Sequence, residues 1–353
     1  MPRTPILPIL SLSLILAATV ATGQSGPKLV TPPGTAKPAW VQPGTPGSPI
    51  NGTVFHAQVL LSAAGFSSGV IDGKDGMSFK AAVRGFQQSR GLPVTGKLDI
   101  ATRRALVERD RPSTVNVKLG HADIGGNYVY PYPKKAEGQA KLKWAGYRNM
   151  LEEVAERYHT TPDTIVALNG PSALIGMGQT LRLPNVLPDS TDYRGPPLKD
   201  EHRALFVKLN IDADEPQGDH IVIDKSEGLL KVLDEGDRLI AQFPVTTGSQ
   251  HDPLPLGNWK VTTYAFLPPF HYQPDLFWDV DDSKDEKMLP PGPNGLVGVA
   301  WLDLTKEHYG IHGTPEPQTI GRTESHGCIR MTNWDVLRMS RMLKPGFKAE
   351  FRA

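Results

Sequence analysis

The spacing of apolar residues changes at Pro196-Pro197, and this change limits the kinds of fold open to the chain. Before these prolines, apolar residues recur at helical spacing, whereas after them they form short runs typical of strands. Three such runs lie between His220 and Phe243, separated by Glu227-Gly228 and Glu235-Gly236-Asp237. Glycine-marked turns between short strands indicate a β-meander. The sequence therefore predicts a multidomain protein in which small helical domains precede a mainly-β domain of sandwich or barrel type, residues 218–353.

Residues 1–23 have the pattern of an export signal. Arg3 is followed by an apolar run from Ile6 to Val20 and by the small residues Ala21-Thr22-Gly23. The run is fifteen residues long and contains Pro8, whereas a helix needs about 20 residues to span a bilayer. We expect export to the periplasm or cell wall, with no stable membrane insertion after signal cleavage. An uncleaved membrane anchor is the alternative.

Residues 24–50 hold seven prolines and four glycines in 27 residues. Such a segment cannot bury enough apolar surface to order itself, so we expect a flexible, partly polyproline linker. The whole chain has a net charge of +1. Nucleic-acid-binding proteins usually carry a basic stripe, so this balance argues against a nucleic-acid partner.

Residues 51–112 are predicted to form a three-helix domain. Ser78 is expected to cap a helix whose Phe79, Val83 and Phe86 share one face, with neighbours over 54–64 and 100–109. Helical spacing alone fits a bundle that merely packs on the rest of the protein. The motifs Phe86-Gln87-Gln88 and Gly91-Leu92-Pro93-Val94-Thr95-Gly96, however, resemble the three-helix peptidoglycan-binding domain, which implies binding to the cell wall.

Residues 128–186 predict a small α+β module with two short helices. Leu151, Val154, Ala155 and Tyr158 make one amphipathic helix, and a second ends at Asn169-Gly170. With Gly178–Asn185, this region resembles a LysM glycan-binding module. The usual Gly-Asp-Thr-Leu opening is replaced by Tyr147-Arg148-Asn149-Met150-Leu151. A structural spacer is therefore an alternative to a sugar-binding module. Residues 187–217 are expected to be a linker.

Cys328 is the only cysteine of the chain and follows Ser325-His326-Gly327. A lone cysteine is commonly a small buried apolar residue, but a neighbouring imidazole or an electropositive turn can make it a thiolate near neutral pH. His312 lies sixteen positions upstream and is the candidate base. Gly327 permits a tight turn that brings amides close to a substrate carbonyl. Two histidines and a thiol could also bind zinc, although closed zinc sites normally have four ligands.

This pattern resembles the L,D-transpeptidase catalytic domain of the YkuD family. The family signature is a histidine followed, some fourteen to seventeen residues later, by Ser/Thr-His-Gly-Cys, which His312 and Ser325–Cys328 match in order. The segments Phe243–Gly248 and Leu289–Asn294 extend the resemblance. Arg330 stands where many members have asparagine, and a guanidinium suits a stem carboxylate. The aromatic insert between Tyr264 and Gly298 corresponds to the family's lid, and its acidic run Asp279–Asp282 has the composition of a solvated surface.

The resemblance implies a cysteine-dependent transfer of acyl groups within peptidoglycan. Cys328 would attack a tetrapeptide stem between meso-diaminopimelate and D-alanine, with His312 as base and the Gly327 and Cys328 amides as oxyanion donors. Ser325 and His326 would orient the turn or polarise the pair. No cofactor or metal is implied; the partners are stem peptides and glycan, with a wall-linked lipoprotein as a further acceptor. An L,D-carboxypeptidase or endopeptidase, lipoprotein attachment, and a non-catalytic wall-binding protein are the alternative functions.

Overall fold

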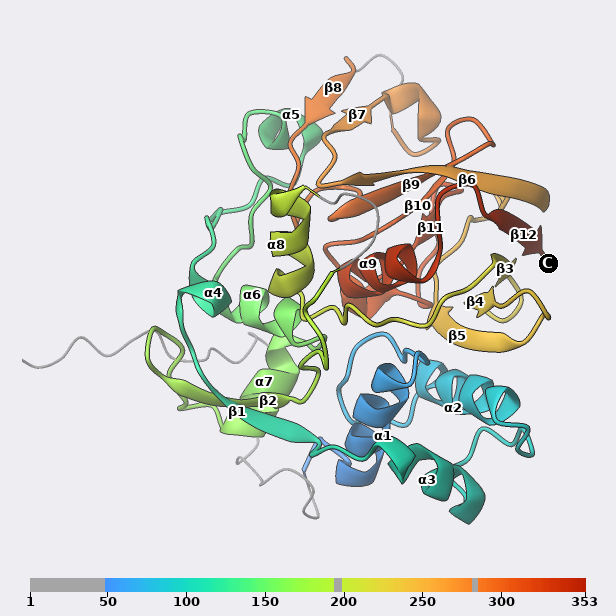
Figure 1. Cartoon of the computed structure of the whole chain (residues 1–353). Coiled ribbons are helices and arrows are strands. Elements are labelled where there is room, and N and C mark those ends of the chain that lie inside the picture. The colour runs from blue at the N-terminus through green and yellow to red at the C-terminus, as the bar shows by residue number, and fades with distance from the viewer. Residues whose placement is uncertain (1–47, 194–198, 281–284) are drawn as a thin grey trace, which may run out of the picture.

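The protein is described from a computed structural model covering residues 48–193, 199–280 and 285–353. The predicted export signal, and the predicted linker as far as residue 47, lie outside the described residues. The described chain has three parts, which Figure 1 shows side by side: a helical domain, a middle unit of residues 114–186, and a C-terminal domain built on a curled sheet.

The helical domain contains the three predicted helices, α1 (Gly52–Ala63), α2 (Met77–Ser89) and α3 (Ile100–Leu106), followed by the short 3-10 helix η1 (Val107–Arg109). The side chains of Asn51 and Asp99 cap α1 and α3 by accepting hydrogen bonds from first-turn amides. The prediction that Ser78 caps α2 is wrong. Extended Gly76 occupies the cap position, so α2 begins before Ser78 and no side chain caps it.

The middle unit pairs its first and last strands around two helices. β1 (Thr114–Lys118) is antiparallel to β2 (Thr180–Pro184), and α6 (Met150–Arg157) and α7 (Pro162–Asn169) pack against them. Both predicted helices are present, and α7 ends at Gly170 with φ +86°. β1 precedes the predicted start at residue 128, and the intervening chain carries the short helices α4 (His121–Ile124) and α5 (Ala136–Gln139).

Helix α8 (Asp200–Lys208) lies within the segment that the sequence predicted to be a linker. Its Leu205 and Phe206, with Leu209 and Ile211 just beyond, are buried in the core of the C-terminal domain. Their burial against the sheet explains why this segment is ordered. The four apolar residues lie within seven positions, too short a run for helical spacing to be distinguished from a strand.

The sheet of the C-terminal domain has eight strands within the described residues, in the order β11-β10-β9-β6-β12-β3-β4-β5. Neighbours are antiparallel except β12 with β3 and β10 with β11, which are parallel. The mainly-β prediction is confirmed, and so is the meander, as β3 pairs with β4 and β4 with β5. The strands are β3 (His220–Asp224), β4 (Leu229–Leu233), β5 (Leu239–Pro244), β6 (Gly257–Phe266), β9 (Ala300–Leu304), β10 (Gly310–His312), β11 (Ile329–Arg330) and β12 (Lys348–Arg352).

Strand β6 joins the two halves of this sheet. Its residues up to Lys260 pair with β12, and its residues from Val261 on pair with β9, with a register shift between Val261 and Tyr264. Such an irregularity increases local twist and bends a strand, which curls the sheet around α9 (Asn333–Met342). The fully buried Trp334 of α9 belongs to the same apolar core as α8. Helices α8 and α9 therefore share one apolar core with the sheet.

The aromatic insert is more regular than the sequence indicated. Its ends pair as the antiparallel strands β7 (Phe270–Tyr272) and β8 (Lys287–Leu289), with the 3-10 helix η2 (Pro274–Leu276) between them. Tyr264 and Phe266 belong to β6, so the insert begins at Leu267. Another 3-10 helix, η3 (Pro317–Thr319), lies between β10 and β11. The hairpin projects from the domain beyond β9 (Figure 1).

The helical domain covers the exposed edge of the sheet at β5. The amide of Gln242 in β5 donates to the carbonyl of Gly65, and the Gln242 carbonyl accepts from the amide of Ser67. Gln242 also reaches the Ala81 carbonyl of α2, and Gly85 leaves room for its side chain. An uncovered edge strand invites pairing with other chains. The docked domain removes that hazard, which makes it part of the folded structure.

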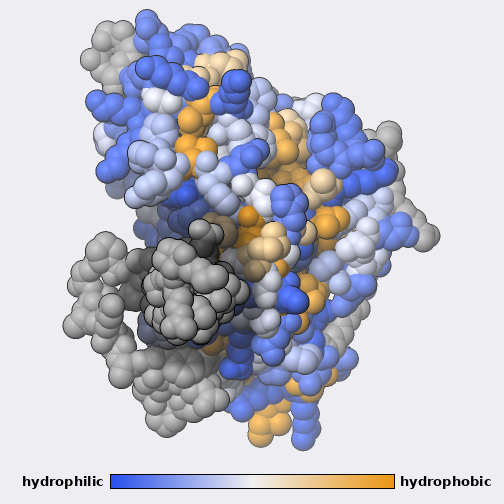
Figure 2. All heavy atoms as spheres, turned by 90° about the vertical axis from the view of Figure 1, so that its left-hand side faces the viewer, coloured by the Kyte–Doolittle hydropathy of each residue, from blue (hydrophilic) through white to orange (hydrophobic). Residues whose placement is uncertain are grey.

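The surface on the side of the middle unit is predominantly hydrophilic, with apolar side chains in small patches where grey atoms do not cover it (Figure 2). In the ranges 48–193, 199–280 and 285–353, every helix is too short or too polar to cross a membrane.

Candidate active site

Strands β9, β10 and β11 place several predicted residues on one face of the sheet. His312 is opposite Trp301 in the antiparallel β9-β10 pair and opposite Arg330 in the parallel β10-β11 pair. Cys328 lies two positions before Arg330, in the bend that leads into β11, and its sulfur lies beside Gly310 at the start of β10. We call the group made by Trp301, Gly310, His312, Cys328 and Arg330 the floor.

The sulfur of Cys328 lies over the start of β10. Its S–H donates to the His308 carbonyl at 3.7 Å, and the Gly310 amide donates to the sulfur. Gly310 has no room for a Cβ, because that atom would lie 2.4 Å from the Trp301 ring. A glycine is therefore needed where the ring, the amide and the thiol meet.

The turn before Cys328 is held from two sides. Gly327 has φ +95°, and a Cβ there would lie 2.6 Å from the Tyr309 ring. The Ser325 hydroxyl donates to the Cys328 carbonyl at 2.5 Å, closing the turn. Ser325 also exchanges backbone hydrogen bonds with Thr247 and Ser249, in the segment that follows β5. The orienting role of Ser325 stays a prediction, for which these hydrogen bonds are the structural basis.

His312 is a buried, neutral histidine with a fixed tautomer. Its Nδ1 lies 2.7 Å from the Gly313 carbonyl. Since a carbonyl can only accept, Nδ1 carries the proton and Nε2 keeps its lone pair. Burial, helped by the charge of Arg330, lowers the pKa of His312 to about 3. The ring stacks on Trp301 at 5.4 Å between centroids.

The thiol is also neutral, which differs from the expectation of a thiolate near neutral pH. Burial raises the pKa of Cys328 and outweighs the Gly310 amide and the Arg330 charge, which both lower it. The side chain keeps some exposed surface, but the surrounding protein removes most of its solvation. The sequence showed the cationic neighbours; it could not show how much water the fold removes. The thiol and the imidazole of His312 are therefore both neutral near neutral pH.

His326 points away from this pair. Its Nε2 lies 2.8 Å from Asp279 Oδ1, and its ring meets Phe277 edge-on at 5.0 Å. Trp278 lies 6.2 Å from the His326 ring and stacks on His251 at 4.3 Å. Residues 270–280 and 285–289 of the insert include these contacts with the turn, and we call them the lid.

Sequence reasoning missed four residues that shape this site. Asp279, which was assigned to a solvated surface, contacts His326, while Trp301 and Tyr309 pack against His312 and Gly327. Asn333 fills the space between Gly298 and Gly313. Side chains alternate between the two faces of a strand, so the sequence of β9 could have shown that Trp301 lies on the face that carries His312 in the neighbouring strand. The other three contacts join segments far apart in the chain, so no local signal marks them.

Over the described ranges, no group of three or more histidine, cysteine, aspartate or glutamate side chains is arranged to hold a metal ion.

Two family models match the chain. Residues 218–350 match "L,D-transpeptidase catalytic domain", and residues 51–106 match "Putative peptidoglycan binding domain". Among similar proteins, "Putative L,D-transpeptidase YkuD" of Bacillus licheniformis is 28% identical over 201 residues, which are 56% of this chain and 89% of that protein. The protein of the same name from Bacillus subtilis is 50% identical over 54 residues, 15% of this chain and 33% of that protein.

Among solved structures, L,D-transpeptidase 3 from Mycobacterium tuberculosis, in complex with a faropenem-derived adduct, is 16% identical. The match covers 38% of this chain and 60% of that chain, with a TM-score of 0.32. The structural likeness at this value adds nothing to the sequence matches.

Proposed function

Residues 218–350 form an L,D-transpeptidase catalytic domain and residues 51–106 a peptidoglycan-binding domain, and from this premise we propose that the protein cross-links peptidoglycan through an acyl-enzyme on Cys328. The donor is the tetrapeptide stem, cleaved between meso-diaminopimelate and the terminal D-alanine. Export and action in the periplasm or cell wall are part of the same proposal.

The observation that carries the proposal is the strand register of the floor. The β10-β11 register brings His312 and Arg330 opposite each other, and the hydrogen bond from the Gly310 amide to the Cys328 sulfur supports a position for the thiol near them. The His312 tautomer leaves Nε2 free to accept a proton. A neutral thiol beside a neutral imidazole suits general-base catalysis, because sulfur becomes a stronger nucleophile as it loses its proton.

Acylation begins when the sulfur attacks the carbonyl carbon of the diaminopimelate L-centre while His312 Nε2 takes the thiol proton. The Gly327 and Cys328 amides donate to the oxyanion. The C–N bond to D-alanine then breaks, and His312 returns the proton to the leaving amine. The products are a thioester on Cys328 and free D-alanine, with no oxidant or reductant needed.

Transfer follows when the side-chain amine of a second stem attacks the thioester. His312 takes a proton from the amine, the C–S bond breaks, and the proton returns to sulfur. Arg330 is suited to bind a stem carboxylate, because its guanidinium is a fork of donors. The lid keeps bulk water from the thioester, so that the amine and not water is the acceptor.

Purified disaccharide tetrapeptides, incubated with the protein and analysed by mass, test this function. We expect free D-alanine together with dimers joined between two diaminopimelate residues. If tripeptide alone forms despite abundant acceptor, the protein is an L,D-carboxypeptidase. If the tetrapeptide is unchanged while the protein sediments with insoluble peptidoglycan, the wall-binding alternative replaces the enzymatic one.

A further inference from the structure

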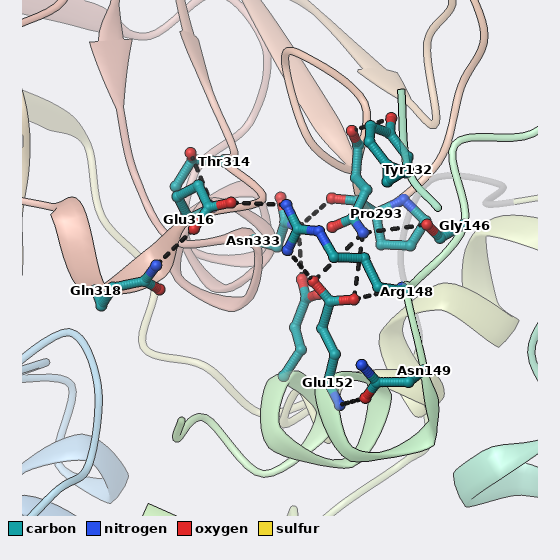
Figure 3. A network of polar contacts seen from close by, with 12 residues as sticks. Tyr132, Gly146, Arg148, Asn149, Glu152, Pro293, Thr314, Glu316, Gln318 and Asn333 are labelled. Carbon is teal, nitrogen blue, oxygen red and sulfur yellow. Dashed lines mark hydrogen bonds and ion pairs between the residues drawn. The ribbon is translucent and has the colours of Figure 1, made fainter. Parts of the chain in front are cut away.

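Helix α6 of the middle unit presents a row of acidic side chains to the C-terminal domain. Glu152 is paired with Arg148, which also binds Glu316 at 2.8 Å, and Glu153 is paired with Lys208 of α8. Figure 3 shows Arg148 between Glu152 of the middle unit and Glu316 of the C-terminal domain, so that its ion pair with Glu316 crosses between the two parts. Glu156 differs, since in the part of the chain that the structure describes its hydrogen-bond partners are Asn333 and Tyr147, neither of them a cation.

Asn333 connects Glu156 to the loops beside the floor. Its Nδ2 donates to Glu156 Oε1 and to the Pro293 carbonyl, the latter at 3.1 Å. Its Oδ1 accepts from the Val299 amide at 3.1 Å. Asn333 has no exposed surface. These three bonds fix which end of the amide faces which loop, because N–H can only donate and the oxygen can only accept.

The fixed oxygen of Asn333 lies between two glycines. A Cβ at Gly298 would be 2.0 Å from it and a Cβ at Gly313 2.1 Å from it. The Gly313 carbonyl is the acceptor for Nδ1 of His312. A rotated or displaced Asn333 amide would therefore move the backbone group that sets the tautomer and orientation of the catalytic imidazole.

We propose that Glu156 is a positioning residue for His312, acting through Asn333 and the Gly313 carbonyl. The proposal rests on the proposed function, in which His312 is the base, and extends the active site into the middle unit. Tyr147 and Arg148, which replace the usual LysM opening, both face this interface. The middle unit thus supports catalysis as a docked part of the enzyme.

The protonation state of Glu156 decides which substitution best preserves its hydrogen bond with Asn333. Burial, together with the charges of Glu152 and Glu153, raises the pKa of Glu156 to about 8, although the hydrogen bonds from Asn333 and Tyr147 lower it. Near neutral pH the side chain is therefore mostly a neutral acid. Glutamine has the same shape and is neutral, with an oxygen that can accept from Asn333.

The test compares Glu156→Gln with Glu156→Ala in the full chain, using a carbapenem and intact-mass detection of the Cys328 adduct. We expect Glu156→Ala to lower the first-order acylation constant about 10- to 100-fold, because a misplacement of about 1 Å caused by a mutation far from the reacting atoms can cost about 100-fold. The acylation constant of Glu156→Gln should stay within about threefold of wild type. Glutamine keeps an oxygen that can accept from Asn333, whereas alanine has no acceptor there. Equal defects in both variants, or none in either, would overturn the proposal.

Glu316→Gln is the matched control. It removes a charge from the same interface at an ion pair whose side chains are 38% and 42% exposed, and such pairs contribute about 0–1 kcal/mol. Its acylation constant should stay within about twofold of wild type. A defect as large as that of Glu156→Ala would show that any loosening of the interface is sufficient, which contradicts a specific role for Glu156.

Histidine side-chain ¹⁵N NMR provides a readout that does not depend on the reaction. Wild type and Glu156→Gln should show His312 as the Nδ1–H tautomer, and Glu156→Ala a mixture of tautomers. If Glu156→Ala does not fold, Asn333→Asp carries the same expectation, because it replaces the donor to Glu156 and Pro293 with an oxygen. An unchanged tautomer overturns the positioning role. If wild-type Cys328 is not acylated, the proposed function fails, and the NMR comparison still decides the role of Glu156.

Discussion

The floor and the lid of the candidate site are held by different kinds of contact. In the floor, His312 is buried in β10, and backbone hydrogen bonds pair this strand with β9 on one side and β11 on the other. The lid meets the turn through ring contacts of Phe277 and Trp278 and one partly exposed ion pair of His326 with Asp279. Ring pairs contribute about 0.5–1.5 kcal/mol each and exposed ion pairs about 0–1 kcal/mol. The floor is therefore held more firmly than the lid.

The largest expected effect comes from the floor, in Cys328→Ser. Serine is nearly the same size but a far weaker nucleophile without a strong base, so acylation by a carbapenem should fall by on the order of 10³-fold or more. Intact-mass spectrometry measures the adduct. Because the chain has one cysteine, thiol titration of the unfolded variant should also fall to zero. An adduct on the serine variant would remove Cys328 as the nucleophile.

Substitution of His312 in the floor and of His326 beside the lid compares the two regions directly. We expect His312→Ala to lower the acylation rate by about 10² to 10⁴, the usual range for a lost general base. His326→Ala should lower it less than about tenfold, because His326 faces Asp279 and the lid. Pre-steady-state acylation of both variants, with melting temperatures as the folding control, provides the measurement. The reverse order of severity would assign the base to His326.

The pH dependence of acylation should show the chemistry of the floor. The pKa of His312 is about 3, so the imidazole stays neutral throughout pH 5–9 and its titration should produce no inflection near 6.5. The raised pKa of Cys328 means that the thiol loses its proton only on the alkaline side, so the rate should rise toward high pH. A wild-type inflection near 6.5 that disappears in His312→Ala would contradict a buried, neutral base.

The smallest effect is expected from the lid and concerns products more than rate. Trp278→Ala removes the stack on His251 and should admit water, shifting products a few-fold from cross-linked dimer toward tripeptide. Met288→Ala is the matched control, because Met288 is in the lid and, like Trp278, is 58% exposed. Mass analysis of muropeptide products decides between them. Equal shifts in both variants would mean that this stack does not control water access.

The sequence by itself determined the parts whose signals are local. Helical spacing predicted the helices of the first two units, and glycine turns predicted the β3-β4-β5 meander. These two predictions succeed because neighbouring residues share one helix face or one strand. The Ser325–Cys328 motif with His312 predicted a reactive pair, and that role stays a prediction. The role of the first unit as a cover for β5 had no such signal, since Gln242 is 161 positions from Ala81.

The tertiary structure alone decided the electrostatics and the supports of the site. The neutral states of Cys328 and His312 follow from lost solvation, which depends on everything that packs around them. The partners of His326 and Asn333 come from segments 47 and 177 positions away. A sequence pattern reports which side chains can donate, accept or ionise. Only packing brings distant groups together and removes the water that would otherwise solvate them.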